Sequence, residues 1–323
     1  MSISIAHVRS QGPALASLGR VAWSVVRSGR RGSGKEPPKQ LESSPPGTPE
    51  NPRLICGAGP EIEALLPPRR RALVRDYLRW SGADSRAYRD VLPPHLFPQW
   101  GLPVLTGLLK EIPYPIQTVL NQGCRLEIRE PLPMGQRLTV RGRLENITED
   151  GRKARIHARL ITGTEACPDA LSADVYVVVP LPASEDGARG PRREKPRVPQ
   201  TVTEIGDRRL GARAGLDFAL LTGDFNPIHW IRPYARVAGF KSTILHGFGS
   251  LAWAYERLIR ARFCGDPNGL AFIDVRFTRP LLLPARIKAF DAPAEGTLRH
   301  IFVGTNPDGP AFLAGTYQSR RRA

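Results

Sequence analysis

The stretch Leu221-Thr222-Gly223-Asp224-Phe225-Asn226-Pro227-Ile228-His229 lies in the second half of a chain of 323 residues. It is followed by Gly239-Phe240 and by Ile244-Leu245-His246-Gly247. A carboxylate, a carboxamide and an imidazole fall within six residues around a proline, and a glycine opens an apolar run eighteen positions after the imidazole. Such a cluster contains the groups needed to hold one water and one carbonyl oxygen at the same time.

These segments resemble the signature of the MaoC-like hydratases and dehydratases, also called the hydratase 2 family, which reads Ser/Thr-Gly-Asp-x-Asn-Pro-x-His, then Gly-Phe, then Ile-x-His-Gly. The resemblance implies an α+β hotdog fold, in which an antiparallel sheet wraps a long helix. It also implies a lyase that reversibly hydrates trans-2-enoyl thioesters to (R)-3-hydroxyacyl thioesters, without a cofactor. The chain departs from the pattern at Ile231, where many members are acidic, and at Thr243, where proline is frequent. Both changes bear on the substrate more than on the reaction.

The resemblance gives four residues catalytic roles that also make chemical sense. Asp224 and His229 are expected to hold a water between them as a paired acid and base, because an imidazole exchanges protons near neutral pH. Asn226 corresponds to a position that orients the substrate or the water. The N–H of Gly247 corresponds to the oxyanion donor, and its place at the start of a helix suits negative charge. His246 is expected to brace the loop through a hydrogen bond.

A metal site is the competing interpretation of Asp224, His229 and His246. No glutamate or cysteine completes that set, and the family uses no metal, so no metal is expected. The chain has four cysteines without CxxC spacing, which fits a reducing compartment and a cytoplasmic protein.

The net charge of +17 raises the question of a nucleic-acid partner. No dense basic stripe or recognisable module supports one. Lys241, Arg236 and Arg232 lie close to the motif and are expected to bind substrate, by attracting the phosphates of coenzyme A or an acidic acyl carrier protein. The alternative is that they only keep the surface solvated.

The first 60 residues are interpreted as a basic leader, rich in proline, glycine and serine and largely disordered. Residues 1–40 contain seven basic side chains and one acidic side chain. An amphipathic helix that touches a membrane and an organellar transit peptide stay open as alternatives. The apolar runs are too short to span a bilayer.

The folded part divides at a linker, residues 181–199, into halves at 61–180 and 200–323 that repeat each other. An offset of 149 places Pro131-Leu132 on Pro280-Leu281, and the strands before them alternate apolar and polar residues. The same offset aligns two expected central helices, at Gly101–Lys110 and Ser250–Arg260, with Pro103 in the first turn of the former. We therefore expect a tandem hotdog.

The first half lacks the Asp-x-Asn-Pro-x-His string and is expected to be catalytically silent, which would leave room for bulky acyl chains. Edge-to-edge pairing of the two copies predicts a double-hotdog monomer or a homodimer of such units. Two other functions stay open. A thioester hydrolase would need a carboxylate on the helix, where Glu256 is the only acid. A non-catalytic acyl-binding subunit would need only a pocket.

Overall fold

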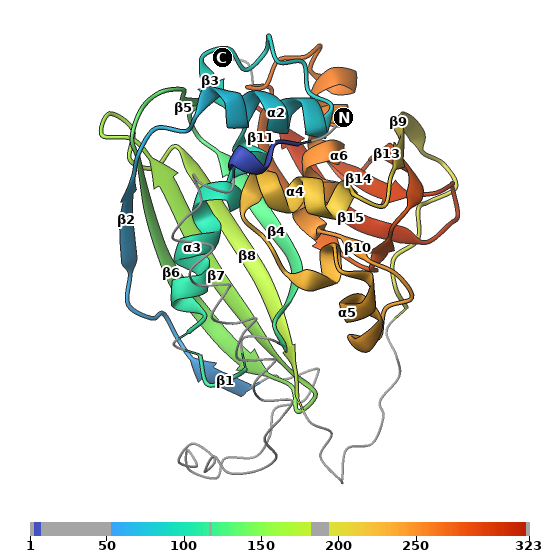
Figure 1. The fold of residues 1–323 in the computed structure, drawn as a ribbon. Coiled ribbons are helices and arrows are strands. Elements are labelled where there is room, and N and C mark those ends of the chain that lie inside the picture. Colours follow the sequence, from blue (N-terminus) through green and yellow to red (C-terminus); the bar gives the residue numbers. More distant parts are fainter. Residues whose placement is uncertain (1–2, 8–52, 111, 116–117, 182–193, 321–323) are drawn as a thin grey trace.

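The computed structural model describes residues 3–7, 53–110, 112–115, 118–181 and 194–320 (Figure 1). In them the two halves share a core order of strand, helix, short strand, central helix and five strands. The N-terminal half contains β1 (Arg53–Cys56), β2 (Ile62–Leu66), α2 (Arg71–Ser81), β3 (Val91–Leu92), η2 (Pro94–Leu96), α3 (Pro98–Leu108), β4 (Leu120–Ile128), β5 (Leu132–Pro133), β6 (Leu138–Glu149), β7 (Lys153–Gly163) and β8 (Leu171–Pro180). The C-terminal half contains β9 (Thr203–Leu210), α4 (Ala214–Thr222), η4 (Pro227–His229), α5 (Arg232–Val237), β10 (Ile244–Leu245), α6 (Gly247–Arg262), β11 (Leu270–Phe277), β12 (Leu281–Leu282), β13 (Ala285–Pro293), β14 (Leu298–Gly304) and β15 (Ala311–Ser319).

One continuous antiparallel sheet joins the halves. Its order is β1-β6-β7-β8-β4-β11-β15-β14-β13-β9, with β2 also paired to β6. The halves meet where β4 pairs with β11, so that Leu126 lies opposite Ile273. Each half thus covers an edge of the other with backbone hydrogen bonds, which removes the exposed edge that a single copy would present. The expected edge-to-edge pairing occurs within one chain.

A short two-stranded sheet repeats in each half and supports the internal repeat. β3 pairs with β5 in the first half, and β10 pairs with β12 in the second. β5 and β12 begin at Leu132 and Leu281, the leucines of the two Pro-Leu pairs that the offset of 149 aligns. The repeat predicted from the sequence is therefore present in the strand pairing.

The central helices α3 and α6 begin three residues earlier than expected, at Pro98 and Gly247. Pro103 consequently lies inside α3 and not in its first turn, which corrects the prediction. Pro98 occupies the first turn instead, where a missing N–H costs no hydrogen bond. The N-terminal ends of the two helices meet, since the rings of Phe97 and Phe248 pack edge to face with centroids 5.1 Å apart.

The boundaries of the leader and linker need correction. Strand β1 pairs with β6, so the first half begins by Arg53 and not at residue 61. Ile3 is buried, and His7 hydrogen-bonds Asp76 of α2 at 2.9 Å, so residues 3–7 also pack on the fold. Residues 8–52 lie outside the described residues, as do 182–193 of the predicted linker. No helix among the described residues is long and apolar enough to span a membrane.

Candidate active site

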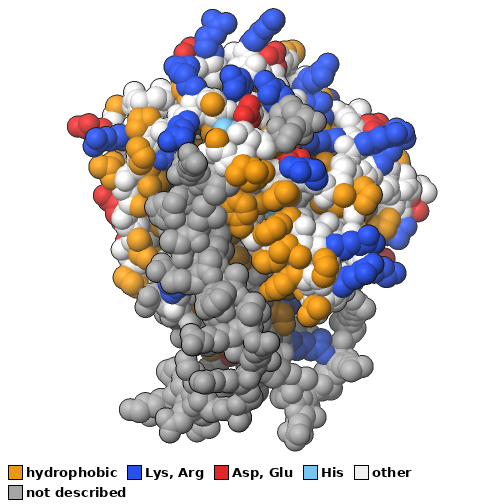
Figure 2. Space-filling view, in the orientation of Figure 1, with side chains coloured by type: hydrophobic (Ala, Val, Ile, Leu, Met, Phe, Trp, Pro, Cys, Tyr) orange, Lys and Arg blue, Asp and Glu red, His pale blue; other side chains and the backbone are white. Residues whose placement is uncertain are grey.

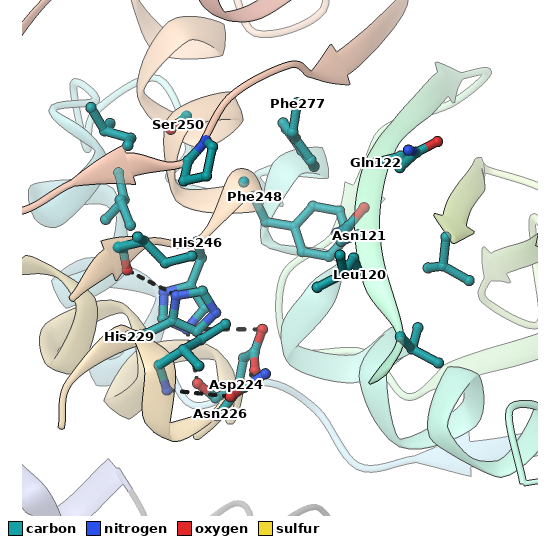
Figure 3. Close-up of a pocket in the computed structure, with 18 of the residues that line it drawn as sticks. Leu120, Asn121, Gln122, Asp224, Asn226, His229, His246, Phe248, Ser250 and Phe277 are labelled. Carbon is teal, nitrogen blue, oxygen red and sulfur yellow. Dashed lines mark hydrogen bonds and ion pairs between the residues drawn. The ribbon is translucent and has the colours of Figure 1, made fainter. Parts of the chain in front are cut away.

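A pocket of about 550 Å³ opens between the halves, and both halves supply its walls (Figure 3). The C-terminal half contributes the motif and the start of α6. The N-terminal half contributes one face of α3 and the ends of β4 and β8. Its lining side chains from the N-terminal half are Leu102, Leu105, Thr106, Leu109, Val119, Leu120, Asn121, Gln122, Val177 and Val178.

The chain between α4 and η4 is shaped by its own short polar side chains. Gly223 ends α4 in the left-handed conformation (φ 86°), and its N–H donates to the carbonyl of Ala219 at 2.8 Å. The Oδ1 of Asp224 accepts from the N–H of Asn226 at 3.4 Å, and the Oδ1 of Asn226 accepts from the N–H of Ile228 at 3.3 Å. These two turns aim the Asp224 carboxylate and the His229 ring toward the same space.

His229 is held from both sides. Its Nδ1 donates to the carbonyl oxygen of Ile244 at 2.8 Å, because a carbonyl oxygen can only accept. Its backbone lies directly on α4, where a Cβ at Gly215 would meet the His229 carbonyl oxygen at 2.0 Å. Glycine is therefore needed at 215, and the Nε2 of His229 is left as an unprotonated acceptor.

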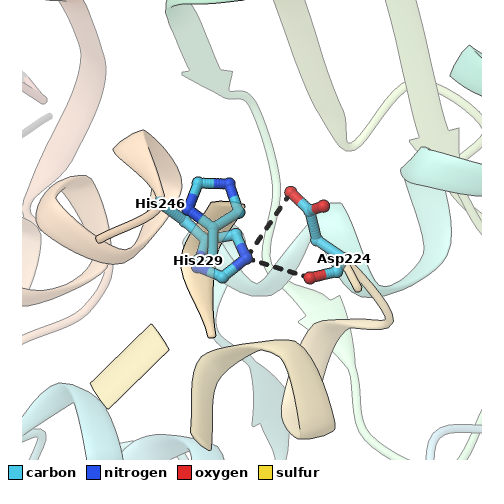
Figure 4. A group of neighbouring side chains, drawn as sticks. All are labelled: Asp224, His229 and His246. Atoms are coloured by element: carbon cyan, nitrogen blue, oxygen red, sulfur yellow. Dashed lines mark hydrogen bonds and ion pairs between the residues drawn. The ribbon is translucent and has the colours of Figure 1, made fainter. Parts of the chain in front are cut away.

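His246 braces the loop, as expected. Its Nε2 donates to the carbonyl oxygen of Asp224 at 2.9 Å and lies 3.8 Å from the Asp224 carboxylate (Figure 4). Its ring stacks on that of His229, with centroids 3.5 Å apart, and packs against the ring of Phe218 from α4 in a tilted geometry. The stack fixes the plane of the His229 ring.

The structure brings Asp224 and His229 together. A carboxylate oxygen of Asp224 and one ring nitrogen of each histidine lie within 4.8 Å of one another. One water can bridge such a gap with two hydrogen bonds of about 2.8 Å. Because the carboxylate and the free Nε2 of His229 are both acceptors, a bridging water would donate both protons and keep its lone pairs for an electrophile.

Burial sets the protonation state of both histidines. Burial and, to a smaller extent, the neighbouring His246 lower the pKa of His229 to about 3, although the charge of Asp224 opposes the shift. Burial likewise lowers the pKa of His246. Both rings are therefore neutral at neutral pH, in agreement with an acceptor at the Nε2 of His229.

Gly247 opens α6 and lines the pocket. The N–H groups of Gly249 and Ser250 donate to the carbonyl of His246, whereas no acceptor for the N–H of Gly247 occurs among the described residues. A Cβ at this position would lie 2.3 Å from the ring of Phe277, so only glycine fits. The free N–H at a helix start can stabilise a developing oxyanion.

Comparison with known proteins agrees with this geometry. Residues 192–291 match the family model of the MaoC like domain. The chain carries a MaoC-like domain. The match begins within the predicted linker.

Relatives and solved structures extend the likeness over both halves. The chain is 26% identical to 3-hydroxyacyl-thioester dehydratase X of Mycobacterium tuberculosis over 62% of this chain and 70% of that protein. The crystal structure of HtdX from the same organism superposes with a TM-score of 0.65 at 21% identity, covering 81% of this chain and all of that one. A conserved M. tuberculosis protein with a double hotdog fold superposes with a TM-score of 0.52 at 16% identity, covering 81% of this chain and 96% of that one. The predicted α+β tandem hotdog is confirmed. Several further curated relatives are matched over less than two thirds of their length.

The MaoC-like domain offers few free metal-ligand atoms. Asp224, His229 and His246 are the three side chains that come close enough to share an ion among the described residues. The Nε2 of His246 carries a proton that it donates to a carbonyl, and the two imidazoles are stacked with an interplanar angle of 23°. Stacked rings do not aim two lone pairs at one point, so this donor set does not fit a tetrahedral ion.

The predicted phosphate-binding residues lie outside the pocket. Arg232 and Arg236 are on α5, Lys241 follows it, and none of the three lines the cavity. They are exposed beside apolar side chains of the same region, Trp230, Tyr234 and Val237. Figure 2 shows hydrophobic side chains gathered over this part of the surface, with basic side chains beside them. Their contact with substrate stays a prediction, as does the orienting role of Asn226, whose observed contact caps η4.

Sequence reasoning missed the cations that do line the pocket, Lys195 and Arg279. It also did not assign the pocket wall on α3, although Leu102, Leu105 and Leu109 share one face of a helix at spacings of three and four. That spacing could have identified the face. It could not have shown that the face is turned toward the MaoC-like domain.

The structure gives a chemical reason to expect no catalysis in the N-terminal half, which stays a prediction. At the offset of 149, Phe97 takes the place of His246 and Pro98 that of Gly247, at the start of α3 and α6 respectively. Proline has no N–H. The first copy thus lacks the oxyanion donor as well as the motif.

Proposed function

We propose that this protein adds water to trans-2-enoyl thioesters to give (R)-3-hydroxyacyl thioesters, or removes it in the reverse direction. The thioester would be carried by coenzyme A or by an acyl carrier protein. One observation supports the proposal most directly: a carboxylate oxygen of Asp224 and a ring nitrogen of His229 lie within 4.8 Å of each other in the pocket that Gly247, with its free N–H, also lines. The MaoC-like domain and the dehydratase name of its relative agree with it.

The reaction follows from these positions. A water held by Asp224 and the Nε2 of His229 presents a lone pair to C3 of the enoyl group. As the oxygen bonds to C3, one water proton passes to the pair, and the C2–C3 π electrons move toward the thioester oxygen, which the N–H of Gly247 stabilises. The pair then returns one proton to C2, so that one water is added across the double bond on a single face.

The apolar wall from the N-terminal half supports acyl chains of medium or greater length as substrates. Leucines of α3 and valines of β8 continue the pocket away from the motif. In a second active copy, catalytic groups would occupy the start of that helix, whereas here it carries Phe97 and Pro98. Apolar surface at this place favours burial of alkyl carbons at roughly 0.8 kcal/mol for each methylene.

The carboxylate that a thioester hydrolase would need is engaged elsewhere in the structure. Glu256, the only acid in α6, accepts hydrogen bonds from the hydroxyl of Tyr88 and from the Nε2 of His95, both at 2.7 Å, and is 3% exposed. It does not line the pocket. A carboxylate so engaged is not placed to activate a water at a thioester carbonyl.

A single assay tests the proposal. Purified protein is incubated with trans-2-decenoyl-CoA, and the loss of the conjugated enoyl absorbance is followed beside the release of free thiol. Loss of absorbance without thiol, with (R)-3-hydroxydecanoyl-CoA as product, is the expected result. Thiol release would instead support a hydrolase, and neither signal would support a binding subunit.

A further inference from the structure

The end of the predicted linker is fixed to the C-terminal half. Val198 is completely buried in a small core with Phe290 and Phe302, and its N–H donates to the carbonyl of Gly309 at 2.9 Å. Arg197 pairs with Asp308, at 3.4 Å between its Nε and the carboxylate. The backbone of residues 195–198 is therefore held against the loop between β14 and β15.

Arg279 holds this segment from the pocket side. Its Nη1 donates to the carbonyls of Pro196 and Ala311, and its Nη2 donates to the carbonyl of Lys195 at 3.0 Å. The guanidinium is thus bound by backbone carbonyls, and no described carboxylate forms an ion pair with it. Arg279 thereby holds the Lys195 backbone beside the pocket that both residues line.

Polar groups concentrate at this part of the pocket. β11 pairs with β4 with Arg276 opposite Gly123, so the continuing chains bring Thr278 and Arg279 alongside Asn121 and Leu120. Asn121, Gln122 and Thr278 all line the cavity. Lys195 also has no described carboxylate partner, and Asp224 is the only carboxylate among the described residues of the lining. Two cations without counter-charge would be stabilised by an anionic group of a ligand.

We propose that Lys195, positioned by Arg279, binds the phosphate of the phosphopantetheine arm that carries the acyl thioester. The inference rests on the proposed function and specifies how the substrate is recognised. It moves phosphate recognition from Arg232, Arg236 and Lys241 to the rim of the pocket. Coenzyme A and an acyl carrier protein share this phosphate, so Lys195 contributes to binding of both.

The proposal is tested with two substrates that differ by one phosphate. They are the trans-2-decenoyl thioesters of pantetheine and of 4′-phosphopantetheine. For the unmodified protein, KM is expected to be about tenfold lower for the phosphorylated thioester, the scale of one charge-assisted contact. Lys195→Gln should bring the two KM values together without changing kcat. Arg279→Gln should do the same although Lys195 is present. Lys241→Gln, which removes the lysine that the sequence predicted for phosphate binding, should keep the tenfold difference.

Equal KM values in the unmodified protein, or a tenfold difference that survives Lys195→Gln, would overturn the proposal. So would loss of the difference in Lys241→Gln alone. The decenoyl thioesters of coenzyme A and of an acyl carrier protein identify the source, because the physiological carrier is the one with the lower KM and Lys195→Gln should raise both. If no thioester is hydrated, the proposed function fails, and calorimetric binding of the two unreactive thioether analogues decides the phosphate contact separately.

Discussion

The Nδ1 of His229 donates to the carbonyl oxygen of Ile244 at 2.8 Å, and this one hydrogen bond decides which nitrogen of the ring can accept a proton from water. His229→Gln removes the ring and its acceptor. We expect kcat for hydration to fall by at least about 10²-fold, as for a positioned acid or base. The rate at which the conjugated enoyl absorbance is lost measures this fall in kcat. His300→Gln on β14, which does not line the pocket, serves as the control, and near-normal turnover by His229→Gln would refute the assignment.

Asp224→Asn keeps the shape of the side chain and removes its charge. The carboxamide cannot accept a proton from the bridging water, so kcat should fall by at least about 10²-fold while KM changes little. Steady-state kinetics with decenoyl-CoA separate the two constants. Asp266→Asn on the exposed surface should leave both unchanged. An increase in KM at constant kcat would mean that Asp224 only binds substrate.

Gly247→Ala places a methyl group against the ring of Phe277, where the Cβ would lie 2.3 Å away. Either the ring or the start of α6 must move, and the oxyanion donor moves with it. We expect kcat to drop by about 10²-fold, the scale for loss of one such donor. Gly211→Ala, where no atom lies within 4 Å of the added Cβ, provides the control. Unchanged kcat would show that the N–H of Gly247 does not act on the thioester oxygen.

The lowered pKa of His229 predicts how stability depends on pH. Between pH 6.5 and about 3 the unfolded chain binds a proton on this residue that the folded chain excludes, so the free energy of unfolding falls on acidification. The contribution is up to about 1.4 kcal/mol for each pH unit. Urea denaturation at pH 7 and pH 5 should show a smaller loss for His229→Gln than for the unmodified protein or His300→Gln. Equal losses of unfolding free energy in His229→Gln and in the unmodified protein would contradict a buried, neutral His229.

The pocket wall on α3 predicts a change in chain-length preference. Leu102→Trp adds bulk to the apolar wall far along the chain from the motif. We expect kcat/KM for decenoyl-CoA to fall by about tenfold, because overpacking at such a site costs 1–3 kcal/mol on the scale of core substitutions. Crotonyl-CoA serves as the internal control and should be affected less than about twofold. Equal loss on both substrates would mean that the acyl chain does not reach α3.

Local patterns in the sequence predicted the repeated parts of the fold. The alternation of apolar and polar residues around Leu126 and Ile128, and around Ile273 and Val275, identified β4 and β11. A half-buried strand shows this alternation because only one of its faces is apolar. The helix starts were less well predicted. Pro98 and Gly247 open their helices without a side-chain cap that would have marked the boundary.

The sequence by itself determined the chemical groups of the site, since Asp224, Asn226, His229 and Gly247 lie in short segments whose turns are formed by neighbouring residues. Only the tertiary structure decided what faces them. The Ile244 carbonyl that fixes the tautomer of His229, the leucines of α3 and the Arg279 contact to Lys195 all join residues distant in sequence. The α3 leucines reach the site because β4 and β11 join two sheets into one, and the other two contacts form where separate segments of the C-terminal half pack together. No local periodicity encodes which residues such packing brings together.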